Sequence, residues 1–328
     1  MDLDGFFGLH PELAPLLGAW DSGNLAIVHA CGAPDESRSH FKAMDLVERG
    51  VDNESGPASG WLGRHLGTCD TGNHSPLRAL AFGERAPRSL LGPAPVLALR
   101  SVEDIGMCDD VRATELMRRS LASMYVSDDG LGRIGRETLE MLDVLDRLDP
   151  RGYQPRGGAT YPETDFGRGL REIALLTKAD VGLEVATLDL GGWDTHFAQG
   201  VVTGQMPRLM RELAQALSAF HTDMSSHLGK VSVVVMTEFG RRAYENASLG
   251  TDHGHGGLML LMGGNVAGGR VHGDWPGLDG RLVGPGDLAI TTDYRDVLAE
   301  VLSKRRHCDA YGEIFPDYTP TMRGVVTS

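Results

Sequence analysis

Side chains that bind metal ions are concentrated in three short segments in the second half of the chain. The segments read GGWDTHFAQG (191–200), MTEFGRR (236–242) and TDHGHGG (251–257). The candidate ligands are Asp194, His196, Glu238, Asp252, His253 and His255. Carboxylates mixed with imidazoles suit zinc or manganese better than magnesium, which prefers oxygen ligands alone. Two such ions stabilise the attacking and leaving oxygens of a displacement at phosphorus or sulfur, so we expect a divalent metal site with that chemistry.

Each segment by itself also has a structural explanation. Asp194 and His196 could form a capped turn, and Glu238 could pair with Arg241 at the end of a strand. The segment 251–257 is harder to explain by packing, because two histidines, an aspartate and three glycines occur in seven residues. Its glycines allow the backbone to fold tightly. The metal-site interpretation therefore depends on all three segments meeting in space.

The elements expected to position these segments alternate between strands and helices. Short apolar runs predict buried strands, and the main ones are LAIVHACG (25–32), LEVATLDL (183–190), VSVVVMTE (231–238) and GLMLLMGG (257–264). Apolar periodicity and turn signals predict helices at 39–50, at 109–149 with a break near 128–130, at 164–180 and at 205–228. Strands that are apolar on both faces, with helices between them, favour a three-layer α/β/α sandwich with a mostly parallel central sheet. Ligands bind at the carboxyl ends of strands in such sheets. Two of the three segments follow a predicted strand and the third precedes one, so all three are adjacent to strands.

Composition limits the classes of function. A chain of 328 residues that is 41% apolar can bury one large core, so we expect a single domain over 1–328 with a helical insertion or cap over 101–180. The net charge of −14 argues against a nucleic-acid binder, which needs a basic surface. No apolar run approaches the length of a membrane span, and no export signal precedes the first strand, so a cytoplasmic location is expected.

The cysteines carry no motif. The four of them lie far apart with no CxxC pair, which indicates neither a zinc knuckle nor a disulfide framework. We therefore expect isolated small hydrophobic side chains at all four positions, which are Cys31, Cys69, Cys108 and Cys308.

Six longer motifs together resemble the 1501 domain-of-unknown-function family of bacterial proteins. They are LAIVHACGAPDESRSHFKAMDLVERG (25–50), GWLGRHL (60–66), LDLGGWDTHFAQG (188–200), VVMTEFGRRAYENASLGTDHGHGG (234–257), MLLMGGNVAGGRVHGDWPGL (259–278) and TTDYRDVLAEVL (291–302). The resemblance runs from about residue 5 to about residue 318. This family is similar to the alkaline phosphatase and sulfatase superfamily, which implies a three-layer fold, a two-metal site and hydrolysis of a small anionic phosphate or sulfate ester.

The resemblance also implies roles for individual residues. Asp194 and His196 would bind one metal ion, and the adjacent Asp252 and His253 would face the second. A further ligand would be His255, which is favoured over His272 in VHGDW. Glu238 has no clear counterpart, so it is a ligand, the group that orients a histidine, or the partner of Arg241.

The family usually begins with a strand that supplies a metal-binding aspartate, and this chain starts after it. The resemblance therefore implies an N-terminally truncated domain, and a twin-arginine export signal if the true start lies upstream. A missing strand also favours the alternative function, a catalytically degenerate metal-binding or assembly protein of the same fold.

Nucleophile and anion-binding candidates come from SRSH (37–40), which follows a strand and starts a helix. The amides at the start of a helix can receive an anion, so Ser39 is either the nucleophile or only a helix cap. His40 could contact the ester oxygens. Arg38 and Arg241 could each hold a phosphate or sulfate group by a two-pronged hydrogen bond.

Overall fold

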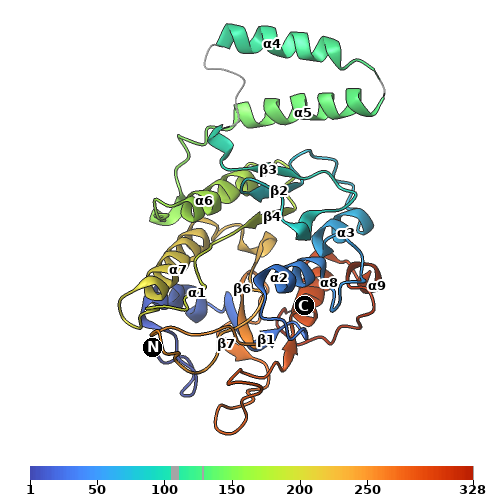
Figure 1. The fold of residues 1–328 in the computed structure, drawn as a ribbon. Coiled ribbons are helices and arrows are strands. Elements are labelled where there is room, and N and C mark those ends of the chain that lie inside the picture. Colours follow the sequence, from blue (N-terminus) through green and yellow to red (C-terminus); the bar gives the residue numbers. More distant parts are fainter. Residues whose placement is uncertain (105–110, 128, 328) are drawn as a thin grey trace.

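The protein contains two β-sheets with helices around them (Figure 1). The structure, a computed structural model, describes residues 1–104, 111–127 and 129–327. The larger sheet has the order β5-β6-β1-β7, with β8 also paired to β1. Its strands are β1 (Leu25–Gly32), β5 (Ser232–Val235), β6 (Gly257–Gly263), β7 (Arg270–His272) and β8 (Thr292–Asp293). The smaller sheet is parallel, with the order β3-β2-β4, and consists of β2 (Ala79–Phe82), β3 (Leu97–Leu99) and β4 (Val185–Leu188).

The expected mixed α/β class is confirmed, but the single, mostly parallel sheet is replaced by two sheets, of which the larger is mixed. Strand β6 runs antiparallel to both of its neighbours, β1 and β5. A parallel connection between adjacent strands needs a crossover, usually a helix, and no helix lies in residues 236–256, which the structure describes throughout. The start of β6 therefore lies at the same edge of the sheet as the ends of β1 and β5.

Helices cover the larger sheet on both faces (Figure 1). Strand β1 is buried along its whole length, and alternate side chains point to opposite faces. On one face, Leu25 and Ile27 pack in a core with Leu217 of α7 (Gln205–Asp223). On the other face, Val28 packs in a second core with Leu298 of α8 (Tyr294–Arg306). The larger sheet is thus the middle of three layers.

The predicted helices are present, with shifted ends. The helices are α1 (Leu17–Asp21), α2 (His40–Arg49), α3 (Trp61–Thr68), α4 (Val111–Met124), α5 (Gly130–Arg147), α6 (Asp165–Lys178), α7 (Gln205–Asp223), α8 (Tyr294–Arg306) and α9 (Tyr311–Ile314). Within the expected insertion at 101–180, α4 and α5 form a hairpin beyond the smaller sheet, whereas α6 packs against α7 (Figure 1). Residues 105–110 and 128 of that segment lie outside the described residues.

The C-terminal segment is held to α8 by a buried carboxylate. Glu300 is 0% exposed and accepts hydrogen bonds from the backbone N–H groups of Arg323, Gly324 and Val326 and from Lys304. Burial alone would raise the pKa of Glu300, but these donors bring the pKa below its usual value. The carboxylate therefore replaces water for three backbone amides.

Cys69 and Cys308 form a disulfide, which corrects the expectation of isolated cysteines. Their Cα atoms are 6.0 Å apart although the residues are 239 positions apart in sequence, so no local spacing pattern could reveal the pair. Cys31 is free and buried, as expected. Cys108 lies outside the described residues. In the described part of the chain, no helix is long and apolar enough to cross a membrane.

Candidate metal centre

Three imidazoles and one guanidinium converge on the carboxylate of Asp194. Its Oδ1 lies 2.9 Å from Nε2 of His253 and 2.9 Å from Nε2 of His196. Its Oδ2 lies 3.3 Å from Nε2 of His40. Arg241 donates from Nη1 to Oδ1 at 2.5 Å. We call these five residues the Asp194 cluster.

The cluster is assembled from four segments, three of them next to strands of the larger sheet and one after a strand of the smaller sheet. His40 begins α2 shortly after β1, Asp194 and His196 follow β4, Arg241 follows β5, and His253 precedes β6. The third and fourth segments pair directly through a β-bridge between Arg241 and His253. The three sequence segments that carry the predicted ligands therefore do meet in space.

A glycine allows the two loops on either side of that bridge to approach. Gly240 donates to the carbonyl of His255 and accepts from the N–H of Gly254, both at 2.8 Å. A Cβ at Gly240 would lie 2.0 Å from the carbonyl oxygen of Gly256. A side chain at this position would force the loops apart and separate Arg241 from His253.

Hydrogen bonds on the far side of two imidazoles fix where their lone pairs point. Nδ1 of His253 lies 2.7 Å from the carbonyl oxygen of Arg38, which can only accept, so Nδ1 carries the proton. Nδ1 of His40 lies 2.6 Å from Oε1 of Glu238 and donates to it. In the neutral imidazoles both Nε2 lone pairs then face Asp194. Two lone pairs aimed at a carboxylate repel it unless a proton or a metal ion lies between them.

The arrangement of His40, Asp194 and His253 fits a metal ion. Nε2 of His40 is buried without a hydrogen-bond partner among the described residues. Ligand atoms of His40, Asp194 and His253 all lie within 4.8 Å of one another. A histidine that donates its other ring N–H to a carboxylate is the usual arrangement of a metal ligand. Of the three roles considered for Glu238, the contact with His40 favours the orienting one.

The second pair of predicted ligands lies beside the first. Nδ1 of His196 is 3.0 Å from Oδ1 of Asp252, and the amide of Asn246 donates to the same oxygen at 2.9 Å. The Nε2 atoms of His196 and His253 are 2.9 Å apart. His196 therefore bridges Asp252 to the Asp194 cluster.

Charge and hydrogen bonding set the protonation of the acids. Burial opposes ionisation of Asp194, but the hydrogen bond from Arg241 and the nearby imidazoles of His253 and His196 hold its pKa well below the usual value. Burial likewise opposes ionisation of Glu238, and bonds from His40 and Thr237 lower its pKa. Burial lowers the pKa of His40, but its hydrogen bond to Glu238 and the nearby carboxylate of Asp194 outweigh this effect and raise the pKa. Both carboxylates are therefore in the ionised form that metals bind.

Other predicted site residues lie outside the cluster. Among the described residues, His255 makes no side-chain hydrogen bond or ion pair, and its side chain is half-buried. His272 is buried on β7 and donates from Nε2 to the carbonyl of Ala267 at 2.8 Å. Neither of the two candidates for the further histidine ligand therefore contacts Asp194.

The nucleophile and anion-clamp candidates lie close to the cluster. Ser39 is exposed at the N-cap position of α2, and its side chain makes no capping hydrogen bond. The side chain of Arg38 forms an ion pair with Asp287, which is 1% exposed. Only the carbonyl of Arg38 contacts the cluster, through His253.

Sequence reasoning missed two supporting residues. Asn246 donates to Asp252 and to the carbonyl of His196, both at 2.9 Å, and so joins two of the predicted segments. Asp287 neutralises Arg38 and lies 3.8 Å from Nε of Arg242. The one available signal was for Asn246, which starts a turn closed by Gly250, a common place for asparagine.

A family model described as "Protein of unknown function (DUF1501)" matches residues 6–304. No curated protein and no solved structure matches the chain.

Proposed function

The chain belongs to the DUF1501 family, and from the Asp194 cluster we propose that it is a metal-dependent hydrolase of phosphate or sulfate esters with an alkaline-phosphatase-like fold. One observation carries the proposal. The Nε2 lone pairs of His40 and His253 face one ionised carboxylate, and each imidazole is fixed by a hydrogen bond on its other nitrogen. That arrangement is repulsive unless a proton or a metal ion lies between the groups, and three ligand atoms within 4.8 Å of one another suit a metal ion.

Two neighbouring positions are available for divalent ions, and zinc or manganese suits the ligands. His40, Asp194 and His253 would hold one ion. His196 and Asp252 would contribute to a second. When bound, the ions would polarise the ester and stabilise its attacking and leaving oxygens. The position at the edge where β1 and β5 end agrees with ligand binding in α/β folds.

Residues of the chain itself supply positioning and charge. Glu238 holds the proton of His40 on Nδ1 and so keeps Nε2 free to bind. Ser39, next to His40, is the candidate nucleophile, and the N-terminal amides of the ten-residue α2 are not capped by its side chain. A metal on Asp194 would compete with Arg241 for the carboxylate, which would leave the guanidinium to bind the ester oxygens.

A catalytically inactive metal-binding or assembly protein of the same fold is the second candidate. It is favoured by the pairing of both expected anion clamps with acids, since Arg38 pairs with Asp287 and Arg241 pairs with Asp194. Such pairs compete with an anionic substrate for the arginines. Metal content and ester turnover together separate the two candidates.

The test is elemental analysis of the purified chain, followed by turnover of an aryl phosphate and an aryl sulfate. We expect bound zinc or manganese in the wild type, and a metal affinity at least about tenfold lower in Asp194→Asn. The control is His74→Ala, at an exposed histidine outside the Asp194 cluster. Equal metal content in wild type and Asp194→Asn, or none in either, would reject the metal site. Bound metal without turnover of either ester would support the second candidate.

A further inference from the structure

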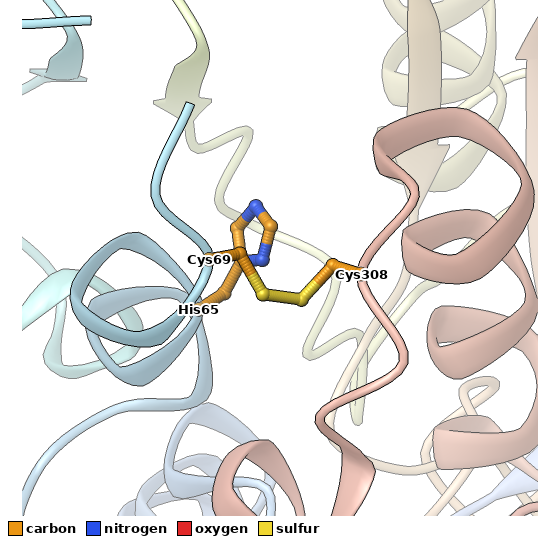
Figure 2. A group of neighbouring side chains, drawn as sticks. All are labelled: His65, Cys69 and Cys308. Atoms are coloured by element: carbon orange, nitrogen blue, oxygen red, sulfur yellow. A yellow bond between two sulfur atoms is a disulfide. The ribbon is translucent and has the colours of Figure 1, made fainter. Parts of the chain in front are cut away.

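A second group of potential metal ligands lies far from the Asp194 cluster in the sequence. It consists of His65, Cys69 and Cys308, with ligand atoms within 4.8 Å of one another (Figure 2). His65 lies in the last turn of α3, and Cys69 comes four residues later, so both face the same side of the helix end. Cys308 follows α8, where His307 adopts a left-handed conformation with φ of 51° and reverses the chain.

The imidazole of His65 lacks a polar partner. His65 is 1% exposed, and its Nδ1 is buried without a hydrogen-bond partner among the described residues. The ring lies beside the two sulfur atoms, with one of its nitrogens on their side (Figure 2). Buried polar atoms in folded proteins nearly always have a partner, so this nitrogen indicates a ligand in some state of the protein.

We propose that reduction of the Cys69–Cys308 disulfide creates a zinc site formed by the two thiolates and His65. Two molecules of a small thiol, or one dithiol, supply the two electrons and two protons, and leave as a disulfide. Zinc then displaces one proton from each cysteine as the two sulfur–zinc bonds form. Two sulfurs and one imidazole are common zinc ligands, and a fourth position is left for water.

The two cysteine residues differ in exposure to solvent. Cys69 is half-buried, whereas Cys308 is 2% exposed. A thiolate in solution therefore attacks the sulfur of Cys69 and releases Cys308. Reversal by a small disulfide would close the bond again and release the metal.

The backbone that carries the ligands is held in place independently of the disulfide. Arg78 donates to the carbonyls of Leu66 and Cys69, at 3.2 and 3.3 Å, and so fixes the end of α3. Glu184 lies 2.9 Å from both Arg78 and Arg306, which ends α8. The two helix ends thus share one carboxylate, and their separation is maintained when the sulfur–sulfur bond opens.

The same connection between α3 and the segment after α8 can therefore be made by a disulfide or by a metal ion. The disulfide and the proposed zinc site each join residues 239 positions apart in sequence, so each restricts the unfolded chain. This inference does not depend on the proposed hydrolase activity, because the Asp194 cluster contains no sulfur.

The test is a cobalt titration of the full chain, with and without a phosphine reductant. Cobalt replaces zinc and gives a thiolate-to-metal charge-transfer absorption only when sulfur is bound. We expect this absorption in the reduced protein alone, saturating with one cobalt per chain beyond the cobalt that the disulfide-bonded protein binds, and we expect zinc to displace it. Cys69→Ser and Cys308→Ser should each abolish it, whereas the control Cys31→Ala should retain it. His65→Gln should weaken cobalt binding by about tenfold or more.

Three outcomes would overturn the proposal. They are a reduced wild type without the absorption, an absorption that survives Cys69→Ser, and an unchanged cobalt affinity in His65→Gln. If the serine variants do not fold, alkylation of the reduced wild type gives the same answer. Zinc should slow the modification of Cys69 and Cys308, as measured by peptide mass, and equal rates with and without zinc would reject the site.

Discussion

Zinc should raise the melting temperature of the disulfide-bonded chain by about 4 °C when its free concentration is about 100 times the dissociation constant. At that ratio a single site adds about 2.7 kcal/mol to the free energy of unfolding. For 328 residues the entropy of unfolding is about 0.7 kcal/mol/K, and the quotient of these two values gives the shift.

The assay is calorimetry on chelator-stripped protein without a reductant. Under these conditions the disulfide stays closed, so His65, Cys69 and Cys308 cannot contribute a second metal effect. Asp194→Asn should remove most of the shift, because Asp194 is the residue that contacts all three imidazoles of the cluster. His74→Ala should keep the full shift. A melting temperature that rises equally in Asp194→Asn, or that does not depend on zinc concentration in the wild type, would refute the reasoning.

Three further predictions concern the surroundings of the cluster and the core. Glu300→Ala should lower the free energy of unfolding by about 3 kcal/mol, because three backbone amides lose their acceptor. Denaturant titration measures this loss, with Glu313→Ala at an exposed position as the control. Gly240→Ala should abolish the zinc-induced rise in melting temperature, because its Cβ would lie 2.0 Å from the carbonyl oxygen of Gly256; an unchanged rise would show that the loops can separate freely. Burial raises the pKa of the Cys31 thiol to about 12, so the folded chain should resist alkylation of Cys31 at about pH 9, where the unfolded chain reacts. Because the raised pKa keeps the thiol protonated in the folded chain, it stabilises the fold fully at pH values below the unfolded pKa, and this stabilisation is lost as the pH rises toward 12. Denaturant midpoints that do not fall over this pH range would contradict the prediction.

Much of the candidate site could be read from the sequence because its residues are locally dense. Two segments next to predicted strands carried Asp194, His196, Asp252 and His253, and the structure brings all of these side chains into contact. The predicted segments lie together although the sheet is mixed. The reason is that an antiparallel β6 begins at the edge where β1 and β5 end.

Other parts of the site could not be read in this way. The hydrogen bond between His40 and Glu238, which lie 198 residues apart in sequence, could not be predicted from local spacing. His255 is two residues from His253, yet only His253 contacts Asp194. Which of two nearby histidines faces inward depends on the path of a loop, and that path is set by its bridge to Arg241 rather than by the loop's own sequence.

The sequence by itself determined the family, the order of strands and helices, and the short segments that carry carboxylates and imidazoles, because these follow from local periodicity and composition. Only the tertiary structure decided the direction of β6, the disulfide between Cys69 and Cys308, and the direction of the lone pairs on His40 and His253. Each of these depends on a partner far along the chain. Packing across the sheet brings such partners together, and no spacing within the sequence records it.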